Sequence, residues 1–233
     1  MTGKKFPLGK ILILVTILAL PGFLYYLLQA KGKNRYKPLP VFGPKVVAST
    51  FRTKRGVKIP DTVYHKITFP QLYNSGGNTV KLDTEGQHLT VVNFFYINNK
   101  NVVPALNKGI TTLQEQFKDN KRIRFISIDV DPKNDTIDQL KQYAGKIGAI
   151  PQKWTILTAD TAITYPLARD QFFVNAFQPK EGEFVFSDKL ILLDAENRIR
   201  GYYTGTSDDE IRRISDELKV LITEELRKVK AEF

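Results

Sequence analysis

The stretch LTVVNFFY, residues 89–96, decides the fold, because six of its eight side chains are apolar or aromatic. A second run of this kind, IRFISIDV, covers residues 123–130. Short runs like these are typical of strands that are buried on both faces of a sheet. Between them, residues 102–117 place apolar side chains at the spacing of an amphipathic helix. The three segments predict a strand, a helix and a second strand, which is the βαβ start of a domain.

The alternation of strand and helix patterns continues toward the C-terminus. Residues 207–210, Ser-Asp-Asp-Glu, form a capping-box sequence that opens a last amphipathic helix. This order of elements predicts an α/β domain with a central mixed sheet flanked by helices, and it resembles the thioredoxin fold. The other expected elements are helices at 136–147 and 165–174 and strands at 154–157, 189–193 and 199–203, the last two joined by a hairpin turn at 194–198.

The net positive charge of the chain comes entirely from its first quarter. The 233 residues carry a formal net charge of +11, which first suggests nucleic acid or an anionic membrane as the partner. Residues 1–60 hold twelve Lys and Arg and no Asp or Glu, whereas residues 61–233 hold 23 basic and 24 acidic residues. A nucleic-acid-binding domain is expected to carry its own basic face, so we expect no nucleic-acid partner.

A long apolar run interrupts this basic segment. After a short basic lead, residues 1–10, the sequence ILILVTILALPGFLYYLLQA covers residues 11–30 without a charge, which is enough to cross a bilayer core of about 30 Å. The alternative is a cleaved signal peptide, but a cleavage site ending at Ala30 needs a small residue where Leu28 stands. We therefore expect an uncleaved anchor in the lipid bilayer, with the N-terminus in the cytoplasm and the large domain outside it.

Residues 31–60 are predicted to be a basic linker that contains Pro and Gly. Two interpretations fit this composition equally well. The linker lies against anionic lipid headgroups, where each basic residue contributes about 1 kcal/mol, or it is a solvated tether. The predicted division of the chain is thus a lead at 1–10, an anchor at 11–30, a linker at 31–60 and a folded domain at 61–233.

The absence of Cys excludes several chemistries. The chain can form no disulfide, thiol nucleophile, Cys-ligated zinc site or iron–sulfur cluster. No Ser-His-Asp spacing, phosphate-binding Gly loop or zinc motif occurs either, so we expect a protein that is not an enzyme. The two histidines, His65 and His88, are not placed together by any pattern, and we interpret them as surface or edge residues.

A set of short motifs follows one another in a characteristic order and spacing: Asn93–Tyr96, Pro104, Phe125–Pro132, Trp154–Thr158, Leu190–Asp194 and Arg200–Tyr203. Through these motifs the chain resembles the SCO/SenC family over roughly residues 60–230. The resemblance implies a thioredoxin-like domain tethered to a membrane by a single span and facing the periplasm or the mitochondrial intermembrane space. Members of the family bind copper and help to assemble the dicopper centre of cytochrome c oxidase, and some act in thiol–disulfide exchange.

The family's copper site is a Cys-Pro-x-x-Cys-Pro loop after the first buried strand, together with a distant His. Carried over to this sequence, the two Cys positions hold Asn99 and Val103, followed by Pro104, and the His position holds Phe186. Copper(I) is a soft ion that prefers thiolate, thioether or imidazole ligands, and none of these three side chains supplies one. The sequence therefore predicts no metal, cofactor or catalytic residue at this site. We expect Val103 and Phe186 to pack together and close it.

Two further features remain open in the sequence. Asp129 and Asp131 follow the second buried strand, where they either bind a hard cation weakly or serve a structural role near Asp135; we favour the structural role. The segment Gln171–Phe186 mixes apolar residues with Gly, Pro and charges and is predicted to be an excursion loop. It serves either as a partner-binding surface or as a cover for the degenerate copper site.

The combined pattern predicts a membrane-anchored, SCO-like protein with a degenerate copper site. We expect a non-catalytic binding or assembly factor linked to the biogenesis of respiratory oxidase. Its expected partners are subunits of respiratory complexes or copper chaperones. The alternative hypothesis is a copper chaperone that uses non-standard ligands or the ligands of a partner.

Overall fold

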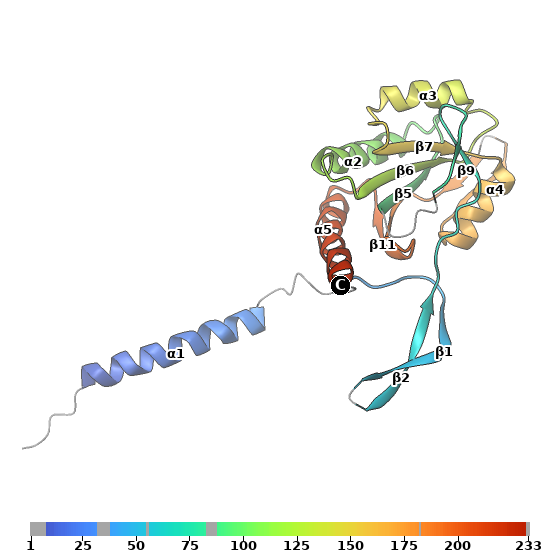
Figure 1. Ribbon diagram of the computed structural model, residues 1–233. Coiled ribbons are helices and arrows are strands. Elements are labelled where there is room, and N and C mark those ends of the chain that lie inside the picture. Colours follow the sequence, from blue (N-terminus) through green and yellow to red (C-terminus); the bar gives the residue numbers. More distant parts are fainter. Residues whose placement is uncertain (1–7, 32–37, 55, 83–87, 182, 232–233) are drawn as a thin grey trace, which may run out of the picture. The chain divides into compact units, whose positions relative to one another are not determined.

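The computed structural model describes residues 8–31, 38–54, 56–82, 88–181 and 183–231 (Figure 1). The chain divides into two compact units, residues 1–37 and 38–233. Residues 1–7 and 32–37, which belong to the predicted lead and linker, lie outside the described residues.

The first unit contains one helix, α1, which covers Leu8–Lys31 and includes the predicted anchor. Its described side chains from Ile13 to Tyr26 are all exposed. Within the described part of the chain, no helix combines the length and the apolar character that a membrane crossing requires.

The second unit is built on a seven-stranded mixed sheet, which confirms the predicted fold class. The strand order is β11-β10-β5-β6-β7-β3-β4. The three central strands, β5, β6 and β7, are parallel to each other, while β10 and β11 add antiparallel strands on one side and β3 and β4 on the other. The strands are β3 (Leu72–Asn74), β4 (Thr79–Val80), β5 (Leu89–Phe95), β6 (Ile123–Asp129), β7 (Trp154–Thr158), β10 (Lys189–Leu193) and β11 (Ile199–Thr204).

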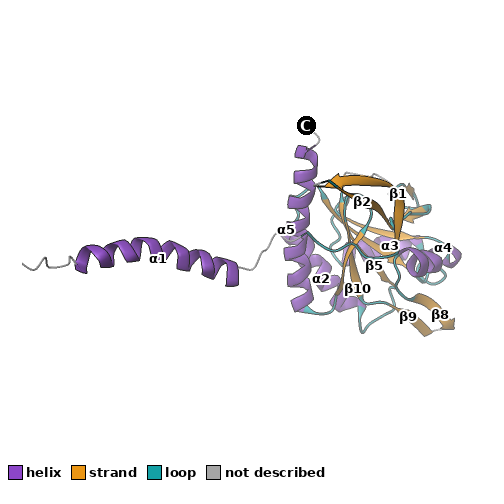
Figure 2. Ribbon diagram, turned by 90° about the horizontal axis from the view of Figure 1, so that it is seen from below, coloured by secondary structure: helices purple, strands orange, loops and turns teal. Residues whose placement is uncertain are grey.

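Helices cover both faces of this sheet (Figure 2). All seven residues of β5 are buried, and its alternate side chains enter two different apolar cores. One core receives side chains of α2, α3 and α5, and the other receives side chains of η1. The helices are α2 (Val103–Gln116), α3 (Ile137–Lys146), α4 (Thr161–Pro166), the π-helical turn η1 (Leu167–Gln171) and α5 (Asp208–Ala231).

Two segments differ from the sequence prediction. The helix expected at 165–174 begins earlier, as α4, because Asp160 caps it by accepting a hydrogen bond from Ala162 N at 2.7 Å. The predicted excursion loop at Gln171–Phe186 contains a two-stranded hairpin, β8 (Ala176–Lys180) and β9 (Glu183–Phe186).

The linker prediction for residues 31–60 is corrected from Pro38 onward. Residues 45–64 form an antiparallel hairpin of β1 (Lys45–Lys54) and β2 (Val57–Tyr64). The segment that leads into this hairpin is tied to the domain, because Phe42 N donates a hydrogen bond to Ile199 O at 2.8 Å. The composition suggested a tether, but backbone pairing between the two strands and these fixed contacts hold the segment in one conformation.

Candidate functional site

The loop between β5 and α2 holds the first of the former ligand positions. Asn99 is half-buried, and its Oδ1 accepts hydrogen bonds from Asn101 N at 3.0 Å and Val102 N at 2.8 Å. Its Nδ2 donates to the hydroxyl oxygen of Tyr96 at 3.1 Å. Both ends of the amide are therefore occupied within the loop, where they fix the turn that begins α2.

The other two positions are filled by packing. Val103 is buried, with 2% of its surface exposed, and belongs to the core that α2 covers. Phe186, at the end of β9, packs against the same core and meets the ring of Tyr96 edge-on at a centroid distance of 5.4 Å. Tyr96 also stacks on Phe184 at 4.5 Å.

We refer to Tyr96, Asn99, Phe184 and Phe186 as the Tyr96 cluster. Its members come from the end of β5, the following loop and β9, so the chain brings the former ligand positions together in space. Val103 and Phe186, which were expected to pack together, contribute to the same core, and the ring of Tyr96 also lies against Phe186. Sequence reasoning missed this role of Tyr96, and its only signal was an aromatic residue three positions before Asn99.

A buried pair of carboxyl groups lies beneath this loop. Asp135 Oδ2 accepts a hydrogen bond from Ile97 N at 2.8 Å, which ties the loop to the segment before α3. Asp129, fully buried at the end of β6, accepts from Asp131 N at 3.0 Å and from Thr158 Oγ1 at 2.8 Å, and it is hydrogen-bonded to Asp135.

Burial raises the pKa of both carboxyl groups of this pair. Desolvation is the main cause for Asp129, and the charge of Asp135 adds to it; the hydrogen bonds from Asp131 N and Thr158 oppose the shift, and the pKa reaches about 8. Burial also raises the pKa of Asp135. We interpret the pair as sharing a proton at neutral pH, which lets two acidic groups approach without repulsion.

The carboxylates singled out in the sequence are thus used in internal hydrogen bonds. Asp131 accepts from Asn134 Nδ2 with both oxygens, at 3.0 and 2.9 Å. Among the described residues, no group of three or more His, Asp or Glu side chains is arranged to hold a metal ion. The structural role that we favoured for Asp129 and Asp131 stays a prediction, and the hydrogen bonds of both carboxyl groups are the contacts that it requires.

The two histidines have separate surroundings. His65 follows β2, and its Nε2 lies 3.0 Å from Gln171 O, while its ring packs on Phe173 at 4.9 Å. His88 precedes β5, where burial lowers the pKa of its ring, and the charges of Arg124 and Lys153 lower it further. The two histidines therefore have different neighbours, and Nδ1 of His88 is buried without a hydrogen-bond partner among the described residues.

A cavity of about 630 Å³ lies beside the Tyr96 cluster, between α2 and α3. Asn99 and Val103 form part of its wall, so it opens directly next to two of the former ligand positions. Lys100, Lys108 and Lys146 line it, and its described wall contains no carboxylate. The cavity wall is therefore positively charged and rich in amide donors, although the basic and acidic residues of the domain nearly balance.

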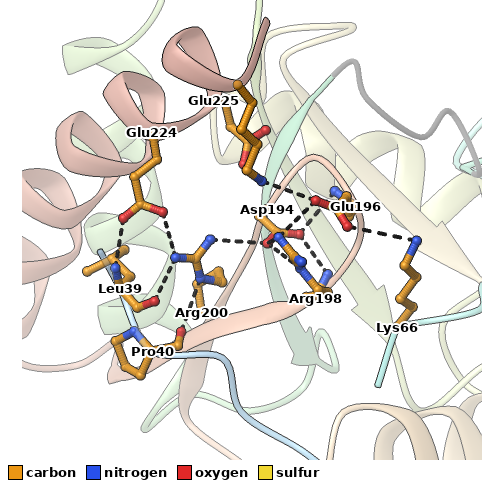
Figure 3. A network of polar contacts seen from close by, with 10 residues as sticks. Leu39, Pro40, Lys66, Asp194, Glu196, Arg198, Arg200, Glu224 and Glu225 are labelled. Carbon is orange, nitrogen blue, oxygen red and sulfur yellow. Dashed lines mark hydrogen bonds and ion pairs between the residues drawn. The ribbon is translucent and has the colours of Figure 1, made fainter. Parts of the chain in front are cut away.

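A second polar assembly, which we call the Arg200 network, joins Arg200 to Asp194, Glu224 and the backbone of Leu39 and Pro40 (Figure 3). Arg200 in β11 has 4% of its side chain exposed and donates to Asp194 at 3.2 Å and Glu224 at 2.7 Å. It also donates to the carbonyl oxygens of Leu39 at 2.7 Å and Pro40 at 3.1 Å. Because every group is paired internally, the network holds the entering chain against the sheet and offers no free group for chemistry.

Comparison with known proteins shows what the folded unit is similar to. The model of the family described as SCO1/SenC matches residues 63–223. The "SCO1 protein homolog" of Bacillus subtilis is 23% identical over 167 residues, which cover 70% of this chain and 86% of that protein.

Solved structures give the same likeness in fold. A SCO1/SenC family lipoprotein from Bacillus anthracis superposes with a TM-score of 0.63 at 22% identity, covering 68% of this chain and 95% of that one. The ScoI structure of Arabidopsis thaliana, solved with copper bound, has a TM-score of 0.55 at 19% identity and covers 68% of this chain and 96% of its own.

Proposed function

The chain belongs to the SCO1/SenC family, and from that premise we propose that it is a non-catalytic assembly factor of respiratory oxidase that docks to other proteins without carrying copper. One solved relative is described as a member of the Sco family of cytochrome c oxidase assembly proteins. Others were solved with copper bound.

The state of the three ligand positions carries this proposal. The Asn99 amide is neutral, hard and already hydrogen-bonded at both ends, Val103 is buried, and Phe186 contributes a ring edge. These groups do not fit copper(I), which requires soft donors. Thiol–disulfide exchange needs a thiolate, and the chain contains no Cys. Function must then come from contact with partners.

We place the protein in a membrane as a single-pass protein, anchored in the lipid bilayer by residues 11–30. The run carries no charged residue, and the described side chains from Ile13 to Tyr26 in α1 are exposed, as lipid-facing residues must be. The basic lead before it favours a cytoplasmic N-terminus, with the folded unit on the periplasmic side.

The partner surface that we propose is the lysine-lined cavity between α2 and α3. It lies next to the former ligand positions, and its lysines and amides favour a partner with acidic or carbonyl groups. Subunits of the oxidase and other copper chaperones are the partner classes that the family membership suggests.

Site-specific crosslinking in membranes tests this function. A photo-reactive amino acid replaces Lys108 in the cavity wall, and the matched control replaces Lys219, which is exposed on α5. We expect crosslinks from position 108, identified by mass spectrometry, to an oxidase subunit or a copper chaperone, and none of these from position 219. Equal crosslinks from both positions, or none from 108, would contradict the proposal.

A further inference from the structure

The β1–β2 hairpin exposes an unusual amount of apolar surface. Among the described residues of unit 38–233, every large apolar side chain that is more than half exposed lies on this hairpin. The hairpin extends away from the central sheet (Figure 1). The exposed fractions are 64% for Val46, 70% for Val47, 53% for Phe51, 63% for Val57 and 58% for Val63. Exposed apolar surface of this kind marks a site of interaction.

These side chains lie on both faces of the ribbon. Val46 pairs with Val63 across the strands, and strand alternation puts Val57 on the same face. Val47 pairs with Thr62 and Phe51 pairs with Pro60, so these two share the opposite face. A protein that docks on one flat face would leave the other face exposed, whereas an apolar layer that surrounds the ribbon covers both.

The same hairpin is strongly basic. Between residues 45 and 58 the sequence contains five Lys and Arg, and the first acidic residue of the whole chain is Asp61. The Nζ atom of Lys58 lies over the Phe51 ring at 4.5 Å, so a cation and an aromatic ring are presented together. Cationic groups beside aromatic and aliphatic side chains suit the interface of an anionic bilayer, where lysine stems extend to the headgroups.

The position of the hairpin in the chain agrees with this partner. Only 13 residues separate the end of α1 at Lys31 from the start of β1 at Lys45. The outer edges of a two-stranded ribbon carry unpaired backbone groups, which cannot enter hydrocarbon but are satisfied by water and headgroups. The interface, and not the bilayer core, is therefore the depth that such a hairpin can occupy.

We propose that the β1–β2 hairpin embeds in the headgroup region of an anionic lipid bilayer and forms a second membrane contact of the folded unit. This inference rests on the membrane anchor proposed above but not on the docking function. The hairpin would hold the unit against the membrane surface. It would also explain why the excess of basic over acidic residues ends within this hairpin.

The test places a tryptophan at the hairpin in the full chain, reconstituted into vesicles. Phe51→Trp reports on β1, and the matched control Phe177→Trp reports on β8, a residue of the other hairpin that is 43% exposed. The native Trp154 is buried and gives both variants the same background. With brominated lipids and phosphatidylglycerol present, we expect quenching of the added fluorescence for Phe51→Trp and none for Phe177→Trp.

Two further measurements separate the contribution of the hairpin lysines from that of the proposed membrane anchor. In the Phe51→Trp background, Lys45→Gln and Lys58→Gln should each lower the ratio of embedded to free hairpin roughly fivefold. A carbonate wash followed by flotation reports on the anchor alone. If the wash removes the chain from the vesicles, the proposed membrane anchor is wrong. The hairpin is then still tested by adding vesicles to the free chain and measuring the quenching. Equal quenching of both tryptophan variants overturns the proposal. It is also overturned if position 51 becomes buried as the protein concentration rises, without any dependence on lipid, because the hairpin then binds another copy of the chain.

Discussion

The Tyr96 cluster and the Arg200 network belong to the same folded unit but differ in polarity. The Arg200 network buries charged groups and pairs each of them, including the backbone of the entering chain at Leu39 (Figure 3). The Tyr96 cluster contains no charged side chain and joins rings and one amide. The Arg200 network thus fixes the entering chain with buried charges, whereas Asn99 and Phe186, two positions where the family resemblance implies ligands, are held by neutral hydrogen bonds and ring packing.

The largest effect is expected from breaking the Arg200 network. Arg200→Ala removes a buried guanidinium from Asp194 and Glu224, which keep Arg198 and Leu39 N as remaining partners. It also removes the hydrogen bonds to the carbonyl oxygens of Leu39 and Pro40, so it should cost about 3 kcal/mol of the free energy of unfolding, measured by urea denaturation. The control Arg212→Ala removes an exposed guanidinium paired with Asp209 and should change stability by less than about 0.5 kcal/mol. If Arg200→Ala lowers the free energy of unfolding no more than Arg212→Ala does, the Arg200 network does not stabilise the folded unit.

The carboxyl pair under the loop predicts a dependence of stability on pH. The pKa of Asp129 is about 8 in the folded chain and near 3.8 without its surroundings, so the folded state holds a proton that the unfolded state releases. Stability should therefore fall as the pH rises from about 4 to about 8, by at most about 1.4 kcal/mol per pH unit, and then level off.

Asp129→Asn should remove this slope, because the amide is neutral at every pH in the window. Asp216→Asn, an exposed change on α5, is the control and should keep the slope. Unfolding curves at pH 5, 7 and 9 decide the point. A slope of the same size in Asp129→Asn would assign the pH dependence to other groups.

The apolar and capping patterns of single segments were enough to predict several strands and helices of the fold. The buried run at 89–96 is found as β5, and the capping-box sequence is followed by α5. The β1–β2 hairpin was missed because its apolar residues alternate with basic and hydroxyl side chains, and Pro60 interrupts β2. The pattern of the segment therefore resembled that of a linker.

The contacts of the site could be predicted only in part. The assignment of Asn99, Val103 and Phe186 to the family's ligand positions is a prediction that is visible in the sequence, because it concerns single positions in the order of the motifs. The role of Tyr96 is not, since its ring partners Phe184 and Phe186 follow almost ninety positions later. The partners of Arg200, at Leu39 and Glu224, are fixed by the same long-range packing.

A smaller effect is expected inside the Tyr96 cluster. Tyr96→Ala removes two ring contacts and the hydrogen bond from Asn99, and should cost about 2 kcal/mol. Tyr96→Phe keeps both ring contacts and should cost about 1 kcal/mol or less. If the two variants lose the same stability in thermal unfolding, the rings contribute nothing and the cluster is held by the hydrogen bond alone.

The smallest effect is expected at Asn99 itself. Asn99→Ala removes the acceptor for the N–H groups of Asn101 and Val102 at the start of α2, which should cost about 1 kcal/mol. The neighbouring, exposed Asn98→Ala is the control and should stay within about 0.5 kcal/mol of the original chain. Equal stabilities of the two variants would show that Asn99 has no part in fixing the loop.

A copper(I) titration against a competing chelator tests the central claim most directly. It compares the unchanged chain with a variant that restores the family's ligands, Asn99→Cys, Val103→Cys and Phe186→His. The account predicts no stoichiometric binding of copper(I) at sub-micromolar affinity by the unchanged chain, and tight binding of one ion by the restored variant, because the framework is kept and only the donors are missing. Stoichiometric, sub-micromolar binding of copper(I) by the unchanged chain would contradict it.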